Sequence, residues 1–181
     1  MGPRGDPWLV VIDVQRIFGE PPSPWAAPRF AEVLPVVDEL VSRFAGRVVF
    51  TRFEPPLPPA APDGSWVDYY EQWPFALDPA TRATYDLVPE PGDAPVVTRP
   101  TMGKYGDALL AATGGSRHLV LCGVSTDCCV LSTALAAADD GAWVRVVRDG
   151  CAGASDEDHE RSLAAMAFYA PQIQVVDSAD L

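Results

Sequence analysis

Short apolar runs recur along the chain between longer segments with a different spacing of apolar residues. The runs are four to six residues long and are apolar without alternation, which predicts strands buried on both faces. They predict six strands, at residues 8–12, 47–51, 95–98, 118–123, 143–147 and 173–176.

The segments between these runs predict helices. Apolar residues from Phe30 to Phe44 recur at helical spacing on one face. Further helices are expected at 105–113, 127–140 and 155–170, which end at Gly114-Gly115, Gly141 and Pro171. Alternating strands and helices are typical of a parallel sheet covered on both faces. We therefore expect a single α/β domain over residues 1–181, with a six-stranded, mostly parallel sheet.

Two proline-rich segments interrupt this alternation. Residues 20–28 contain Trp25, and residues 54–79 hold seven prolines together with Trp66, Tyr69, Tyr70, Trp73 and Phe75. Long loops in a compact domain are usually lids or binding loops, and the aromatic content disfavours disorder. Two interpretations stay open: a hydrophobic cluster at the sheet edge or a subunit interface, and a wall of a substrate pocket.

The charge of the chain limits its partners. The formal net charge is −12 and the sequence pI is about 4.4, so the surface repels nucleic acid and anionic lipid. No apolar run approaches the length of a membrane span, and no signal-peptide core precedes the first predicted strand. We expect a cytoplasmic protein with no nucleic-acid or membrane partner. The four cysteines form no C-x-x-C pair, which favours reduced thiols.

The segment from Leu119 to Val130 carries the densest candidate chemistry. A predicted strand ends at Gly123, and Cys129 falls in the first turn of the next helix. Free backbone N–H groups and the helix dipole there stabilise a thiolate, and they can also receive an oxyanion. Cys129 could equally be a small buried hydrophobe, as most free cysteines are. Cys128 is a rival, but adjacent helical residues point about 100° apart, so we expect at most one to face a cleft.

A nucleophilic cysteine needs a base and a cationic neighbour. The two histidines are poorly placed: His118 opens a strand at the wrong end, and His159 lies well inside the last helix. Asp13 and Lys104 follow the first and third predicted strands, at the carboxyl ends where α/β sheets place their sites. Taken singly, Asp13 could cap a loop and Lys104 could be solvated.

Three sequence elements resemble one protein family. The G-V-S-T-D-C-C-V run of residues 123–130 resembles the G-V-x-T-D-x-C-V motif of the isochorismatase-like cysteine hydrolases. Residues 11–18, V-I-D-V-Q-R-I-F, resemble the opening I-D-x-Q-x-x-F element of that family, and residues 103–106, G-K-Y-G, resemble its lysine element. The resemblance implies a three-layer αβα fold with a doubly wound sheet.

The resemblance also implies a mechanism. Asp13, Lys104 and Cys129 would form a catalytic triad in which Asp13 takes the thiol proton. A cis peptide between Val124 and Ser125 would aim the backbone N–H groups of Ser125 and Cys129 at an oxyanion. Attack by the thiolate would give a thioester acyl-enzyme that water then hydrolyses.

The sequence departs from the metal-binding members of this family. Nicotinamidases carry an aspartate and several histidines soon after the second strand, where residues 51–56 here read T-R-F-E-P-P. Both histidines lie elsewhere, so we expect no metal and no other cofactor, and nicotinamide is a doubtful substrate.

Cys129 favours hydrolysis of a C–N bond in a small amide, ureido (carbamoyl) or lactam compound. Family members that cleave vinyl ethers commonly lack the cysteine. Ether hydrolysis with Asp13 as the acid, and a non-catalytic binding protein on the same fold, are the alternatives. The expected substrate-binding residues are Phe18, Trp25, Phe53, Trp73 and Tyr105. We also expect a homo-oligomer, either dimer or tetramer, because a sheet this short leaves an active-site face for a second chain to close.

Overall fold

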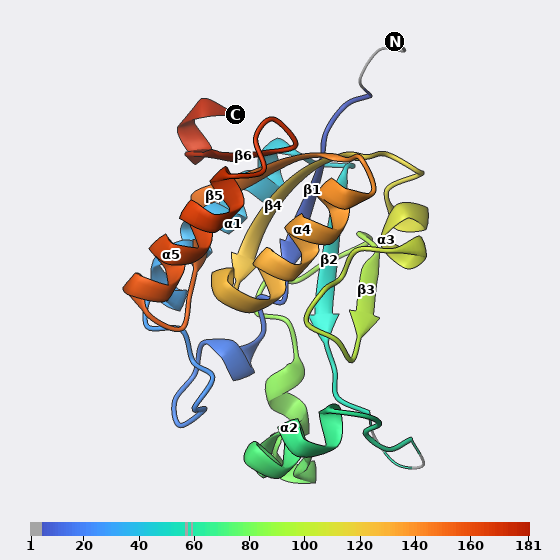
Figure 1. The fold of residues 1–181 in the computed structure, drawn as a ribbon, viewed down its shortest axis with the longest axis vertical. Helices are drawn as coiled ribbons and strands as arrows, with labels where there is room; N and C mark the ends of the chain where they lie inside the picture. The colour runs from blue at the N-terminus through green and yellow to red at the C-terminus, as the bar shows by residue number, and fades with distance from the viewer. Residues whose placement is uncertain (1–4, 57, 59) are drawn as a thin grey trace.

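The computed structural model describes residues 5–56, 58 and 60–181 and shows one six-stranded sheet (Figure 1). The strand order is β3-β2-β1-β4-β5-β6. Every pair of neighbouring strands is parallel, so the expectation of a mostly parallel sheet is confirmed and strengthened. The bounds are β1 Trp8–Ile12, β2 Val48–Phe53, β3 Val96–Arg99, β4 His118–Val124, β5 Trp143–Ala152 and β6 Ile173–Val176.

Helices cover both faces of the sheet, which confirms the three-layer αβα fold. The α-helices are α1 Phe30–Arg43, α2 Trp66–Gln72, α3 Asp107–Ala112, α4 Leu131–Asp139 and α5 Asp156–Ala167. In Figure 1, α4 and α5 lie in front of the sheet and α1 lies behind it. No helix in the described part of the chain is long and apolar enough to cross a membrane.

The core is divided by the pleat of the strands. Leu9 and Val11 of β1 face the α1 side, whereas Val10 and Ile12 face the side of α4 and α5. All four side chains are fully buried. Successive strand residues point to opposite faces, so a strand that is apolar at every position requires a helical layer on each side.

The elements differ from the prediction in three places. β5 continues to Ala152, beyond the predicted end at residue 147, because backbone pairing with β4 resumes after a register shift. A π-helical turn, Thr126–Val130, precedes α4, and α5 ends at Ala167. The polar residues Arg148 and Asp149 interrupt the apolar run in β5, so the pattern alone ended the strand too early.

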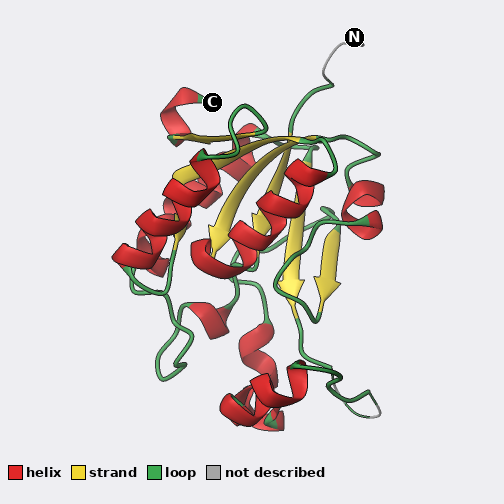
Figure 2. Cartoon of the chain, viewed as in Figure 1, coloured by secondary structure: helices red, strands yellow, loops and turns green. Residues whose placement is uncertain are grey.

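The proline-rich segment after β2 becomes helical from Trp66 onward. It contains α2 and two 3₁₀ helices, Pro74–Leu77 and Pro79–Tyr85. Pro74 and Pro79 lie at the first positions of these short helices, where the missing N–H has no helical partner to lose. Figure 2 shows this segment beyond the carboxyl ends of the central strands, on the side away from both termini.

Candidate active site

Three strand ends bring the predicted triad together. Asp13 follows β1 at the centre of the sheet, Lys104 follows β3, and Cys129 lies in the π-helical turn after β4. The three side chains are almost fully buried, with exposed fractions of 0 % for Asp13, 0 % for Lys104 and 3 % for Cys129. A buried ionic pair beside a thiol is costly to fold unless each partner is bonded.

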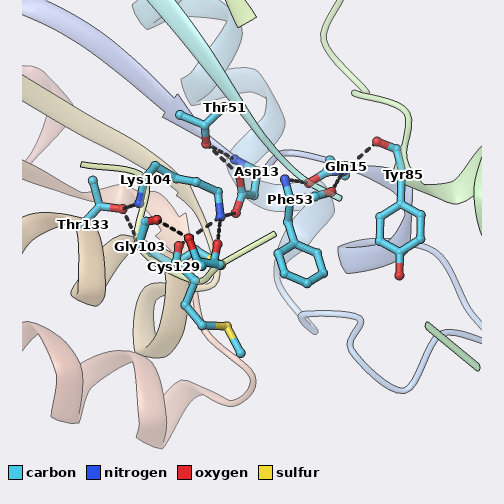
Figure 3. A network of polar contacts seen from close by, with 11 residues as sticks. Asp13, Gln15, Thr51, Phe53, Tyr85, Gly103, Lys104, Cys129 and Thr133 are labelled. Carbon is cyan, nitrogen blue, oxygen red and sulfur yellow. Dashed lines mark hydrogen bonds and ion pairs between the residues drawn. The ribbon is translucent and has the colours of Figure 1, made fainter. Parts of the chain in front are cut away.

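Asp13 and Lys104 form a bonded ion pair (Figure 3). Lys104 Nζ lies 2.8 Å from Asp13 Oδ2 and also donates to the carbonyl oxygens of Thr101 and Met102. The Thr51 hydroxyl donates to Asp13 Oδ1 over 2.6 Å and accepts from the Asp13 N–H at 3.2 Å. These contacts fix the direction of both charged groups.

The backbone is strained where β1 and β4 end. Asp13 has a φ of +49°, which is unusual for a residue other than glycine. Gly123 has a φ of +118°, and a Cβ there would lie 2.1 Å from the Ile12 carbonyl oxygen. Only glycine therefore permits the close approach of the two strand ends that carry Asp13 and the cysteine turn.

Cys129 is held as a neutral thiol. Its side chain lies beside the charged groups of Asp13 and Lys104. Burial raises the pKa of the Cys129 thiol well above its ordinary value; the negative Asp13 raises it further, whereas Lys104 opposes both. The carboxylate that would accept the thiol proton therefore belongs to a neighbouring residue that Lys104 and Thr51 hold in place.

The turn that carries Cys129 has the predicted cis peptide bond between Val124 and Ser125. The Ser125 carbonyl oxygen accepts hydrogen bonds from the N–H groups of Cys128 and Val130, both at 3.1 Å. Thr126 Oγ1 and His159 Nδ1 lie 2.8 Å apart behind the turn. Burial lowers the pKa of His159, so this histidine is a neutral structural partner, consistent with its dismissal as a base.

A cavity of about 230 Å³ opens onto the cysteine turn. Four of the five residues predicted to bind substrate line it: Phe18, Trp25, Phe53 and Trp73. The rings pack on one another, and Trp25 lies 6.0 Å from Phe18, 6.1 Å from Phe53 and 6.0 Å from Trp73 between ring centroids. The aromatic loop residues Tyr69 and Trp73 therefore form a wall of the cavity.

Tyr105, the fifth predicted residue, lies outside this cavity. Its hydroxyl donates to Asp140 Oδ2 over 2.6 Å, near the end of α4. The prediction rested on its position next to Lys104. Because the Lys104 side chain turns inward to Asp13, the side chain of its neighbour points away from the site.

Both Cys128 and Cys129 line the cavity, so the expectation that at most one would face a cleft is wrong. The cavity lies at the end of the helix rather than along one side, and residues pointing in different directions can border it. The two thiols differ in burial, since Cys128 is half-buried and Cys129 is buried. Burial and the neighbouring Asp127 raise the pKa of Cys128 to about 11.

Two threonines and one glutamine support the site and were not predicted to do so. Thr51 binds Asp13, and Thr133 joins the Lys104 segment to the cysteine turn. The buried Gln15 side chain donates to the carbonyl oxygens of Phe53 and Tyr85 and accepts from the Phe53 N–H, which fixes the wall of the cavity. Thr51 ends the second predicted strand, and Asp13 follows the first. These neighbouring strand ends could have predicted the contact between the two residues.

Several solved structures share this all-parallel αβα fold. The structure of a cysteine hydrolase from Pseudomonas syringae pv. phaseolicola superposes with a TM-score of 0.81 at 18 % identity, over 96 % of this chain and 89 % of that one. A zinc complex of the pyrazinamidase of Pyrococcus horikoshii gives a TM-score of 0.69 at 24 % identity, over 97 % and 99 % of the two chains.

The isochorismatase domain matches residues 7–180, so the chain belongs to the isochorismatase family. Isochorismatase domain-containing protein 2 of Xenopus laevis is 44 % identical over 50 residues, which are 28 % of this chain and 24 % of that protein. The match thus spans about a quarter of that curated relative.

The zinc of the pyrazinamidase raises the question of whether this site fits a metal. Among residues 5–56, 58 and 60–181, no group of three or more His, Cys, Asp or Glu side chains is arranged to hold one. After β2, the cavity wall is the aromatic ring of Phe53, which offers no ligand atom. These residues do not fit a metal ion.

Proposed function

We propose that the protein is a cysteine hydrolase that cleaves a C–N bond of a small amide, ureido or lactam compound. The observation that carries the proposal is the convergence of the Asp13–Lys104 pair on Cys129, which lines an aromatic cavity. Family membership supports hydrolysis, because the structural neighbours include a cysteine hydrolase and a pyrazinamidase.

The first half of the reaction is acylation. As the Cys129 sulfur attacks the carbonyl carbon, its proton passes to the neighbouring Asp13 carboxylate. The backbone N–H groups of Ser125 and Cys129 receive the oxyanion. The C–N bond then breaks, and Asp13 returns the proton to the departing nitrogen. A thioester on Cys129 and a free amine or ammonia result.

The second half is hydrolysis of the thioester. Asp13, again a carboxylate, accepts a proton from a water molecule that attacks the acyl carbon. The carbon–sulfur bond breaks, the acid product leaves, and the proton returns to the Cys129 sulfur. Lys104 stabilises the negative Asp13 in both halves and holds it in one orientation.

The nucleophile can be tested with the two adjacent cysteines. A panel of primary amides, carbamoyl compounds and lactams is scored for released ammonia or amine. Cys129→Ala should abolish turnover and leave the fold intact, whereas Cys128→Ala should retain most activity. Limiting iodoacetamide should label Cys129, as located by mass spectrometry. Label confined to Cys128, together with an active Cys129→Ala variant, would overturn the assignment.

A further inference from the structure

The charge lining the cavity has one sign. Among the described residues, Asp127 is the one charged side chain in its wall, and no lysine, arginine or histidine joins it. Lys104 cannot serve a substrate as a cation, because its ammonium group is fully buried and is bonded to Asp13 and two carbonyl oxygens. The formal net charge of −12 adds a long-range field that repels anions.

Tyr69 brings a hydroxyl group to the aromatic wall. Its ring is fixed between Trp25, Trp66 and Tyr70, at centroid distances of 5.9, 5.1 and 5.4 Å. Within residues 5–56, 58 and 60–181, no hydrogen bond engages the Tyr69 hydroxyl. Burial raises the pKa of the phenol, and negative charge on Cys128 or Cys129 would raise it further, so the group stays protonated.

We propose that the cavity selects uncharged amides, and that Tyr69 is a specificity-determining residue whose hydroxyl donates a hydrogen bond to the bound substrate. This inference rests on the proposed function of the site and names its substrate class. A half-buried hydroxyl on a rigid ring, without a protein partner among the described residues, can donate to an acceptor atom of a ligand that takes the place of water in the cavity.

The charge, the aromatic rings and the volume of the cavity all favour a small uncharged substrate. A carboxylate entering this cavity would give up its hydration, meet no cation and approach Asp127. An uncharged amide gives up less, and its flat group can stack on the rings. The volume of about 230 Å³ lies below the range of about 300–1,000 Å³ found for drug-sized ligands, so the substrate is small.

The charge rule is tested with pairs of amides of equal size. Terephthalamide and 4-carbamoylbenzoate differ in one amide against one carboxylate, and succinamide and succinamate form a smaller pair. For at least one pair, kcat/KM of the uncharged member should exceed that of the anion by about 100-fold or more, as expected for an unpaired buried charge. Equal or faster hydrolysis of the anions would overturn the inference.

The role of Tyr69 is tested with Tyr69→Phe and the matched control Tyr70→Phe. Tyr70 is adjacent, its buried hydroxyl also has no hydrogen-bond partner among the described residues, and it lies outside the cavity wall. Tyr69→Phe should lower kcat/KM of the better uncharged amide about tenfold, and Tyr70→Phe should change it less than about twofold. Both variants should keep the wild-type rate of Cys129 alkylation. Equal effects of the two variants would overturn the role of Tyr69.

Binding to the Cys129→Ala variant separates this inference from the proposed function. Calorimetry with the same pairs should show the uncharged amide bound and the anion excluded. If that selectivity is present but no amide is hydrolysed by the wild type, the proposed reaction is wrong and the charge rule stands. If neither member of either pair binds to the Cys129→Ala variant, the charge rule is overturned.

Discussion

Thr133 bonds the lysine segment to the cysteine turn through a single hydroxyl. Its Oγ1 accepts from the Lys104 N–H at 2.9 Å and donates to the Cys129 carbonyl oxygen at 2.6 Å. The side chain is fully buried, so water cannot replace either bond. This side chain therefore ties the backbone that carries Lys104 to the turn that carries Cys129.

Thr133→Val should separate that positioning from simple packing, with Thr133→Ser as the control. Valine fills the same space but leaves the Lys104 N–H without its partner, at a cost of about 1–3 kcal/mol in the free energy of unfolding. We expect kcat to fall about tenfold or more while KM changes little. Serine keeps the hydroxyl and should keep most of kcat. A valine variant with reduced stability in urea but unchanged kcat would show a structural role alone.

The buried ion pair makes a second prediction. Lys104→Met leaves the Asp13 carboxylate buried without its counter-charge and should lower the free energy of unfolding by about 3–5 kcal/mol. The double variant Asp13→Asn, Lys104→Met removes both charges and should recover much of that loss. Urea unfolding of four proteins, the wild type, Lys104→Met, Asp13→Asn and the double variant, measures the difference. Additive losses in the double variant would contradict a coupled pair.

The pKa of Cys129 predicts the pH range of its thiolate. Because burial raises this pKa, the thiolate absorbance near 240 nm should be absent at pH 7 in a difference spectrum against Cys129→Ser. A raised pKa in the folded state stabilises the fold fully below the unfolded value of about 8.5, and this contribution is lost as pH rises toward the folded value. Cys129→Ser should therefore lose less stability at alkaline pH. A thiolate band at pH 7 would contradict this assignment.

The strands and two of the site residues could be predicted from the sequence, whereas residues placed by tertiary contacts could not. The fully buried strand residues Val10 and Val11 gave a clear signal because burial on both faces demands apolar residues. The positions of Asp13 and Cys129 followed from strand ends, where chain direction alone places them together. By contrast, Tyr105 is directed by the turn around Lys104, and Thr133 acts through a tertiary contact. Neither leaves a periodic pattern in the sequence.

Removal of metal ions tests whether the site needs a bound metal for activity. The Phe53 ring in the cavity lining offers no ligand atom, and no cluster of ligands occurs among the described residues. Activity should persist in excess chelator, and elemental analysis should find no stoichiometric zinc or iron. Activity that disappears in chelator and returns with one particular metal would show that the residues do hold an ion.

The aromatic wall makes the last prediction, at Trp73. Its ring contacts Trp25 at 6.0 Å and Phe75 at 6.2 Å between centroids, and it lines the cavity while remaining half-buried. Trp73→Ala removes a stacking surface for the substrate but leaves the sheet and the buried pair of Asp13 and Lys104 untouched. We expect KM to rise about tenfold, since one aromatic contact contributes about 0.5–1.5 kcal/mol beyond the area that it buries.

The matched control is Trp66→Ala, because Trp66 packs on Tyr69 and Tyr70 but does not line the cavity. This variant should lower the free energy of unfolding and affect KM less than Trp73→Ala does. Substrate titrations and urea unfolding of both variants separate the two effects. If Trp73→Ala loses stability and leaves KM unchanged, the segment from Trp66 to Phe75 is a structural cluster, and the residues that select the substrate are sought in the rest of the lining, which includes Phe18 and Met102.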